Sequence, residues 1–370
     1  MKLLLAGGGT MGPVSPLIAV YQKLKTTQTI DCLFLGTAQG PERTAVESYG
    51  IRFRSIRAGK LRRYINWQNL SDPFNVIIGF FQSLGIMVRW RPDVVVVAGG
   101  FVGVPVVWAA WLLRVPVLIH QQDILTGLAN RLMCRFARRI TVSFETSLAD
   151  FNPKKVVHTG NPVRPEIGQC HTDARSMFHL TADRPVILIL GGGTGAANIN
   201  RLVAESLSEL TKYCQVLHIT GRGKQTNLEH EGYRQYEFLT SEMSDALCAA
   251  DIVVCRSGLS TLSELIVLSK PVITIPMADT HQEDNASYFQ SRHALVGMRE
   301  HGLTAASFAG AIKELLFNQT RREQLAQTLS GLMPHDGAAR VAAEVMKLVA
   351  KPTNQKMPTQ TKSKTSNDRA

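Results

Sequence analysis

The sequence has few cysteines and none of the paired spacings that mark disulfide scaffolds or zinc sites. Its six cysteines are scattered along 370 residues, and no two of them form a Cys-x-x-Cys motif. We therefore expect all six thiols to be reduced, as in a chain that folds in a reducing compartment. Met1 leads directly into an apolar run, so we also expect no signal peptide.

Motifs for several other kinds of site are missing as well. No Gly-Lys-Ser/Thr triplet follows either glycine cluster, which excludes a P-loop. The His- and acid-rich segment 276–289 lacks the His-x-His and His-x-x-x-His spacings, so we expect no metal there. The net charge is +12, but no DNA- or RNA-binding motif accompanies it, and we expect no nucleic-acid partner.

Short apolar runs alternate with helical stretches in two similar halves. This alternation is typical of α/β folds with doubly wound parallel sheets, and 370 residues exceed one ordinary core. A turn-rich segment at 160–175 separates the halves, and we place the hinge near Pro162. The predicted strands are residues 2–6, 32–36, 93–99, 116–120 and 139–143, then 186–192, 215–221, 236–239, 251–256 and 271–277.

One uncharged run, Val94–Leu113, is long enough to span a bilayer. Gly99, Gly100, Gly103 and Pro105 interrupt it near the centre. We therefore interpret the run as a buried strand, a turn and the start of a helix.

Two basic segments account for much of the positive charge. Residues 51–64 carry six basic side chains and no acidic one, and the apolar stretch 75–88 follows them. Such a pair favours a membrane surface over a merely solvated face or a nucleic acid. The tail, residues 351–370, is polar and basic, and we expect it to be disordered.

Each half opens with a strand and a glycine-rich turn, at Gly7–Gly12 and at Gly191–Ala196. Ligands of such sheets bind at the carboxyl ends of the strands, where free N–H groups and a helix N-terminus attract phosphate. A dinucleotide fingerprint with Asp31 as its acidic residue fits the first turn but leaves the second unexplained.

The second half contains the most specific cluster, Cys255–Leu265. A strand ends at Arg256, a turn follows, and Ser260 or Thr261 is placed to cap a helix. Glu264 then lies one turn into the helix, where it could accept the two hydroxyls of a ribose. The alternative is a capping box between Glu264 and Thr261.

Polar side chains also follow two other strands. Gln282 and Asn285 come after the strand at 271–277, and their amides suit sugar hydroxyls. His120 and Asp123 end the strand at 116–120 in the run His-Gln-Gln-Asp. These residues are either structural hydrogen-bonding groups or parts of an active site.

Eight stretches in order resemble the MurG-type glycosyltransferases of peptidoglycan synthesis, glycosyltransferase family 28. The resemblance covers residues 1–345. Its stretches are the opening loop with VSP, GKLRRYINWQNLSDPF, GGFVGVP, HQQDILTGLANR, GNPVR, LGGGTGAANIN, CRSGLSTLSE and DTHQEDNA.

The resemblance implies a GT-B fold, in which two Rossmann-like domains face each other across a cleft. Residues 1–162 would bind the acceptor and the membrane, residues 163–336 would bind the UDP-sugar, and a helix at 337–350 would cross back. The implied reaction is inverting transfer of N-acetylglucosamine from UDP-GlcNAc to lipid I, undecaprenyl-diphospho-MurNAc-pentapeptide, which forms lipid II without a metal or other cofactor. The protein would lie peripherally on the cytoplasmic face of the bacterial membrane, with other cell-wall synthesis proteins as partners.

The resemblance also implies roles for single residues. Glu264 would hold the ribose, Gln282 the N-acetylglucosamine hydroxyls, and the opening loop the acceptor diphosphate. His120 and Asp123 are the catalytic candidates. The donor-site candidates are Arg164, Gly193, Thr194, Arg256, Ser257, Gly258, Ser260, Thr261, Glu264, Gln282 and Asn285, and the acceptor-site candidates are Thr10, Met11, Gly12 and Gly100.

The sequence departs from the family pattern near the expected reaction centre, at Met11, Pro13, Gln121, Asp123 and Gly193. Pro13 replaces the family's histidine, and we expect it to pre-set the first turn of a helix. Asp123 is our hypothesis for the general base. The departures leave three alternatives: a transferase with another sugar or lipid acceptor, a non-catalytic UDP-sugar-binding paralogue, and a UDP-GlcNAc 2-epimerase.

Overall fold

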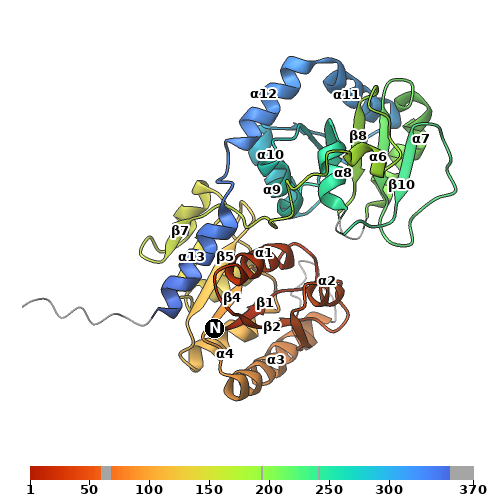
Figure 1. Ribbon diagram of the computed structural model, residues 1–370. Helices are drawn as coiled ribbons and strands as arrows, with labels where there is room; N and C mark the ends of the chain where they lie inside the picture. The colour runs from red at the N-terminus through yellow and green to blue at the C-terminus, as the bar shows by residue number, and fades with distance from the viewer. Residues whose placement is uncertain (60–67, 193–194, 241, 351–370) are drawn as a thin grey trace, which may run out of the picture.

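The computed structural model describes residues 1–59, 68–192, 195–240 and 242–350, which form two α/β units (Figure 1). The strands of the first unit are β1 (Lys2–Ala6), β2 (Asp31–Gly36), β3 (Arg52–Ser55), β4 (Val94–Val97), β5 (Val117–Gln121), β6 (Arg139–Val142) and β7 (Val156–His158). Its helices are α1 (Val14–Lys25), α2 (Glu42–Ser48), α3 (Gln68–Trp90), α4 (Gly103–Leu112), α5 (Leu128–Cys134) and the 3-10 helix η1 (Glu145–Asp150).

The second unit follows a linker segment, residues 160–175. Its strands are β8 (Val186–Leu190), β9 (Gln215–Ile219), β10 (Tyr233–Tyr236), β11 (Ile252–Cys255), β12 (Val272–Thr274) and β13 (Val296–Gly297). Its helices are α6 (Ala174–Met177), α7 (Ala197–Leu210), α8 (Met243–Ala249), α9 (Leu259–Val267), α10 (His281–Gln290), α11 (Ala305–Phe317) and α12 (Gln319–Ser330). A last helix, α13 (Gly337–Val349), belongs in space to the first unit.

Each unit is built on one parallel sheet. The strand order is β3-β2-β1-β4-β5-β6-β7 in the first and β10-β9-β8-β11-β12-β13 in the second. Every pairing that joins these strands is parallel. The predicted doubly wound α/β architecture is thereby confirmed.

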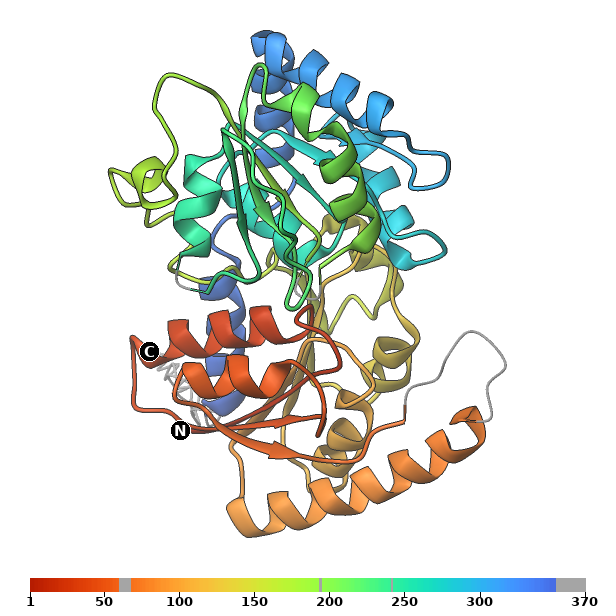
Figure 2. The same ribbon diagram turned by 90° about the vertical axis from the view of Figure 1, so that its right-hand side faces the viewer.

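Both faces of each sheet are buried, which explains why the central strands are apolar at nearly every position rather than at alternate ones. In β1, Leu3 and Leu5 pack in a cluster with α1 and α13, whereas Leu4 and Ala6 face α3 and α4. In β8, Ile187 and Ile189 face α7 and α11, and the alternate residues face α8 and α9. Figure 2 shows these helices on the two sides of each sheet.

The chain crosses between the units twice, and the two crossings touch. A Cβ on Gly160 would lie 2.6 Å from the carbonyl oxygen of Pro334, and one on Gly337 would lie 2.4 Å from that of Asn161. Only glycine permits this backbone contact. Beyond it, α13 packs beside α1 through Val341 and Val345 (Figure 1).

Several expectations about local structure can be compared with the fold. The run 94–113 is indeed a strand, a turn and a helix. Among the described residues, no helix combines the length and the apolar character that crossing a bilayer requires. Pro13 is the N-cap residue of α1, with a φ of −67°, and so directly precedes the first turn of the helix. The predicted strand at 236–239 is misplaced, because β10 ends at Tyr236.

The prediction that all thiols are reduced is wrong for one pair. Cys170 in the linker segment and Cys248 in α8 form a disulfide, with their Cα atoms 6.0 Å apart. The other four cysteines are free. Spacing rules could not find this pair, because the fold joins residues 78 positions apart.

Candidate functional site

The loops at the carboxyl ends of the two sheets meet at the interface between the units. Gln122, just after β5, connects the opening loop (residues 7–13) with α9 of the second unit. In the amide orientation that satisfies both of its ends, its nitrogen donates to the Gly12 carbonyl at 2.9 Å, and its oxygen accepts from the Ser260 hydroxyl at 3.0 Å. The same oxygen also accepts from the Ser260 backbone N–H at 2.9 Å. The two predicted ligand loops therefore share one location.

A second contact across the interface joins Asp123 and Asn285. The Asn285 amide nitrogen donates to Asp123 Oδ1 at 3.2 Å and to the Ser257 carbonyl at 3.1 Å. Its oxygen accepts from the backbone N–H of Ile124 at 3.3 Å. Asn285 is fully buried while Asp123 remains half-buried. The carboxylate of Asp123 is thus held in place and still reachable.

Gln121, one of the departures from the family pattern, shapes the turn that presents Asp123. Its amide nitrogen donates to the carbonyls of Asp123 at 2.7 Å and Leu125 at 3.1 Å. Its oxygen accepts from Asn130 Nδ2 at 2.5 Å. The neutral amide can donate to these two carbonyls, whereas a glutamate carboxylate only accepts hydrogen bonds and would repel them.

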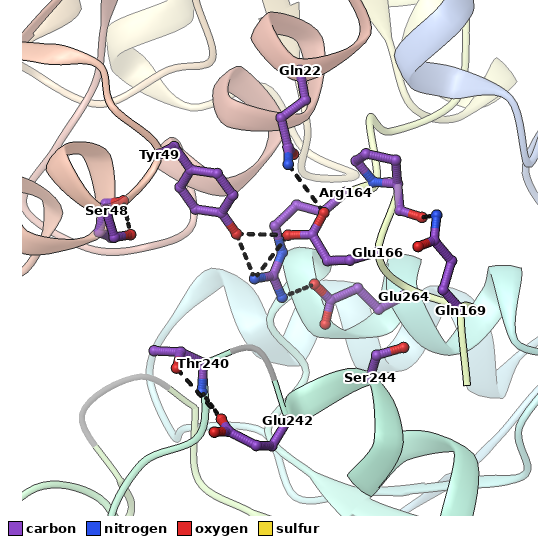
Figure 3. A network of polar contacts seen from close by, with 12 residues as sticks. Gln22, Ser48, Tyr49, Arg164, Glu166, Gln169, Thr240, Glu242, Ser244 and Glu264 are labelled. Atoms are coloured by element: carbon purple, nitrogen blue, oxygen red, sulfur yellow. Dashed lines mark hydrogen bonds and ion pairs between the residues drawn. The ribbon is translucent and has the colours of Figure 1, made fainter. Parts of the chain in front are cut away.

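Arg164 and Glu264 form a buried ion pair (Figure 3). Arg164 Nη2 lies 2.9 Å from Glu264 Oε1, and the two side chains are 18% and 10% exposed. Burial raises the pKa of Glu264, and Arg164 opposes this rise.

The capping expectations for helix α9 are wrong: Gly258 is the N-cap of α9, without a side-chain cap. Glu264 is therefore available for a ligand rather than used in a capping box with Thr261.

Arg256, one of the expected donor-site residues, makes its contacts with the protein itself. Its Nη1 donates to the carbonyls of Ile275 at 3.0 Å and Pro276 at 3.1 Å, and its Nη2 pairs with Glu300. Glu300 in turn accepts from the backbone N–H of Ala278 at 3.3 Å. The guanidinium is thus turned into the loop after β12, which it supports.

His120 is not placed for catalysis. It is 1% exposed, its Nδ1 lies 2.9 Å from Thr141 Oγ1, and its Nε2 lies 2.9 Å from Asn161 Oδ1. Burial lowers its pKa to about 4, so the ring is neutral at pH 7. A buried imidazole with both nitrogens engaged cannot reach a substrate, and the structural alternative for His120 holds.

Gln282 lies at the start of α10, where Thr280 caps the helix by accepting from the Gln282 N–H at 3.2 Å. Its side-chain oxygen accepts from the Met277 N–H at 3.1 Å. The side-chain nitrogen of Gln282 has no hydrogen bond among the described residues, which leaves a donor for a sugar hydroxyl.

The Glu42 side chain supports the opening loop, although no sequence motif marks this residue. This fully buried carboxylate accepts from the N–H groups of Gly9 at 3.3 Å and Thr37 at 2.7 Å. Thr10 is exposed, whereas Met11 and Gly12 are half-buried. Gly100, with a φ of +78°, comes close enough that a Cβ would lie 3.5 Å from the Gly8 carbonyl oxygen.

Two of the donor-site candidates, Gly193 and Thr194, lie outside the described residues. The residues on either side of them, Gly192 and Gly195, both have positive φ. A Cβ on Gly195 would lie 2.1 Å from the Thr220 carbonyl oxygen, so only glycine fits there. The described residues hold no group of three or more His, Cys, Asp or Glu side chains that could bind a metal.

Three further polar residues take part in the interface, and of these only Asn161 lies in a stretch that resembles the family, GNPVR. Asn161 links His120 to the Ser263 hydroxyl, to which its amide nitrogen donates at 2.8 Å. Tyr49 and Glu166 lie beside Arg164 (Figure 3). They stand in segments without a motif, so only the fold reveals them.

Family models match both units of the chain. The glycosyltransferase family 28 N-terminal domain matches residues 3–142, and the family's C-terminal domain matches residues 186–341. A curated relative from Bacillus cereus is 37% identical over 321 residues, which are 85% of this chain and 91% of the relative. One from Clostridium kluyveri is also 37% identical, with the same shares over 322 residues. Both are named UDP-N-acetylglucosamine–N-acetylmuramyl-(pentapeptide) pyrophosphoryl-undecaprenol N-acetylglucosamine transferases.

Solved structures share the fold at lower sequence identity. Acinetobacter baumannii MurG aligns with a TM-score of 0.69 at 23% identity, over 94% of this chain and 99% of that one. UDP-GlcNAc 2-epimerase from Neisseria meningitidis, bound to UDP-GlcNAc, aligns with a TM-score of 0.68 at 16% identity, over 94% and 100%. These likenesses concern the arrangement of the two sheets, since the fold is shared by enzymes of different chemistry.

Proposed function

Because the chain belongs to glycosyltransferase family 28, we propose that it transfers N-acetylglucosamine from UDP-GlcNAc to undecaprenyl-diphospho-MurNAc-pentapeptide in peptidoglycan synthesis. The observation that carries this proposal is the direct contact between loops of the two sheets, through Gly12, Gln122 and Ser260. It supports a donor bound at one sheet edge and an acceptor at the other. Residues 1–162 with the helix at 337–350 would serve the acceptor and the membrane, and residues 163–336 the donor.

The donor nucleotide is expected at the turns after β8 and β11. Glu264 would accept hydrogen bonds from the ribose hydroxyls, and Arg164 would keep the carboxylate ionised in its buried position. The diphosphate would meet the N-terminus of α9 at Ser257, Gly258 and Ser260, where N–H groups and the helix dipole favour negative charge. Gln282 would orient the sugar through its free amide donor.

Asp123 is our candidate for the general base on the acceptor hydroxyl. The hydrogen bond from Asn285 fixes the position of one carboxylate oxygen and leaves the other for the substrate. The proton of the attacking hydroxyl would pass to Asp123 as the bond from that oxygen to the sugar carbon forms, while the bond from this carbon to the phosphate oxygen breaks and UDP leaves. Attack from the face opposite UDP would invert the configuration at that carbon.

The opening loop and Gly100 would bind the acceptor diphosphate. Thr10 is exposed at the tip of the loop, and the N-terminus of α1 follows directly. Pro13 supplies no N–H, and the buried Glu42 already occupies the N–H of Gly9. The remaining donors include the Thr10 hydroxyl and the N–H groups of Thr10, Met11 and Gly12.

The first unit carries a surface suited to a membrane. Phe74, Ile77 and Phe81 on α3 are 67%, 53% and 63% exposed. Beside Phe81, a cavity of about 630 Å³ is lined by three arginines, Arg43, Arg54 and Arg89. Exposed apolar side chains beside cationic ones favour an anionic bilayer surface. This supports peripheral attachment to the cytoplasmic membrane face, where the lipid-linked acceptor resides.

A transfer assay with purified protein tests the proposal. Radiolabelled UDP-GlcNAc and lipid I in detergent should give a labelled lipid product, and Glu264→Ala should give much less. A panel of other UDP-sugars tests donor choice. Label transferred from another sugar but not from UDP-GlcNAc would point to a related transferase, and UDP binding without any transfer would point to a non-catalytic paralogue.

A further inference from the structure

The first unit reaches across the interface to the linker segment through two side chains that the proposed reaction does not use. Gln22 on α1 donates to Glu166 Oε2 at 3.1 Å. Tyr49, directly after α2, donates from its hydroxyl to Glu166 Oε1 at 2.6 Å. Glu166 is thereby held by two residues of the acceptor unit (Figure 3).

The same tyrosine hydroxyl also holds Arg164. Arg164 Nη1 donates to the Tyr49 oxygen at 3.3 Å, while Nη2 donates to Glu264 Oε1 at 2.9 Å. Burial, together with the hydrogen bond to Glu166, raises the pKa of Tyr49, so the phenol keeps the proton that it donates. A continuous polar chain thus runs from Glu166 through Tyr49 and Arg164 to Glu264.

Arg164 has few other partners that could fix its guanidinium. Its Nε is buried without a hydrogen bond, and the nearest alternative anion, Glu166 Oε1, lies 3.9 Å from Nη1. Without the Tyr49 hydroxyl, one side of the guanidinium would lose its closest acceptor. The side chain could then rotate away from the orientation in which it supports Glu264.

We propose that Tyr49 is a positioning residue for donor binding, which lets the acceptor unit hold Arg164 and Glu264 in the geometry that a ribose requires. The inference rests on the proposed function, since it assigns Glu264 to the ribose of a uridine nucleotide. In this arrangement, a residue of the acceptor unit sets the affinity of the donor site. Donor affinity then depends on the two units keeping their contact.

The test replaces the hydroxyl alone. Tyr49→Phe should raise the Kd for UDP and the KM for UDP-GlcNAc by about 5- to 20-fold, less than the loss of a direct hydrogen bond to a charged group because Tyr49 acts through Arg164. The kcat and the KM for lipid I should change by less than about twofold, because the ring still packs against the first unit's core. Gln22→Met, which removes only the support of Glu166, should give a smaller rise in the same KM.

A matched control is Tyr21→Phe on α1, whose hydroxyl makes no hydrogen bond in the part of the chain that the structure describes; it should leave all constants unchanged. A double-mutant cycle separates positioning from general structural support. In a Glu264→Gln background, Tyr49→Phe should weaken UDP binding by less than about twofold, because its effect acts through Glu264.

Two results overturn the inference alone: wild-type protein that binds UDP while Tyr49→Phe binds it equally well, or a Tyr49→Phe effect of the same size with and without Glu264→Gln. Wild-type protein that binds no UDP overturns the proposed function, and the inference with it. Calorimetry on the folded variants distinguishes these cases.

Discussion

The Asn285 amide donates a hydrogen bond to the Asp123 carboxylate over 3.2 Å, although 162 positions separate the two residues in the chain. Asn285 belongs to α10 of the second unit, and Asp123 lies in the turn after β5 of the first unit. In the proposed function, this half-buried carboxylate would meet the donor sugar and the acceptor hydroxyl. The account of catalysis depends on this placement.

Replacing the carboxylate of Asp123 by an amide tests its role as the base. Asp123→Asn should lower kcat by about 10²- to 10⁴-fold, the usual contribution of a general base, with UDP affinity within about threefold of wild type. Steady-state transfer kinetics and UDP titration measure the two effects. Asp284→Asn, an exposed carboxylate on the same helix as Asn285, is the control. An unchanged kcat for Asp123→Asn would remove Asp123 from the mechanism.

Removing Arg164 should destabilise the protein in a pH-dependent way. Arg164→Met leaves Glu264 buried without its partner, which costs about 3–5 kcal/mol of unfolding free energy at neutral pH. The variant also loses the interaction that opposes the raised pKa of Glu264. Without Arg164, the folded state keeps a proton on Glu264 that the unfolded state releases. Stability therefore falls as pH rises from the pKa of Glu264 in the unfolded chain to its higher pKa in the folded state. Denaturant unfolding should therefore show a smaller loss at pH 5 than at pH 8, and an equal loss at both would refute this explanation.

His120 should affect the pH dependence of the unfolding free energy rather than the reaction rate. Its pKa is lowered to about 4 in the folded state, so the unfolded chain takes up a proton first as pH falls below about 6.5. Stability should decline between pH 6.5 and 4, by up to about 3 kcal/mol from this residue. His120→Gln should show a flatter decline, while His218, whose pKa burial also lowers to about 4, continues to contribute. An identical decline in the variant would contradict the prediction.

The exposed phenylalanines of α3 should control membrane binding. Phe74→Ser combined with Phe81→Ser should reduce partitioning into anionic vesicles by about tenfold or more for each ring, because each buried ring contributes about 1.5–3 kcal/mol. Vesicle sedimentation measures the effect. Phe317→Ser is the matched control, since Phe317 is 69% exposed on α11 of the other unit. Equal losses from the control would show that exposure of apolar side chains in general, rather than this surface, drives binding.

Strand positions could be predicted well wherever both faces of the sheet are buried. Continuous apolar runs such as Val94–Val97 and Val186–Leu190 are typical of strands with helices packed on both faces of the sheet. Edge strands were missed because they are short or polar. β3, for example, has the sequence Arg-Phe-Arg-Ser, and β13 has only two residues. Their place in the sheet is set by the neighbouring strand rather than by their own pattern.

The site could be predicted only as far as residue types and strand ends allow. The carboxyl-edge rule correctly brought together Gln122, Asp123, Ser260 and Asn285. It could not give side-chain direction, and the side chains of Arg256 and His120 point into the protein. Glu42 and Tyr49 could not be found from sequence, because their roles depend on contacts with distant segments.

Titration of UDP into wild-type protein and Glu264→Gln, followed by calorimetry, tests the central claim most directly. The claim is that a uridine nucleotide binds at the turn after β11 with its ribose on the Glu264 carboxylate. We predict one UDP site in the wild type and about 10- to 100-fold weaker binding in Glu264→Gln, because a hydrogen bond to a charged group is lost. Equal affinity in the two proteins, or no heat of binding in the wild type, would contradict the account.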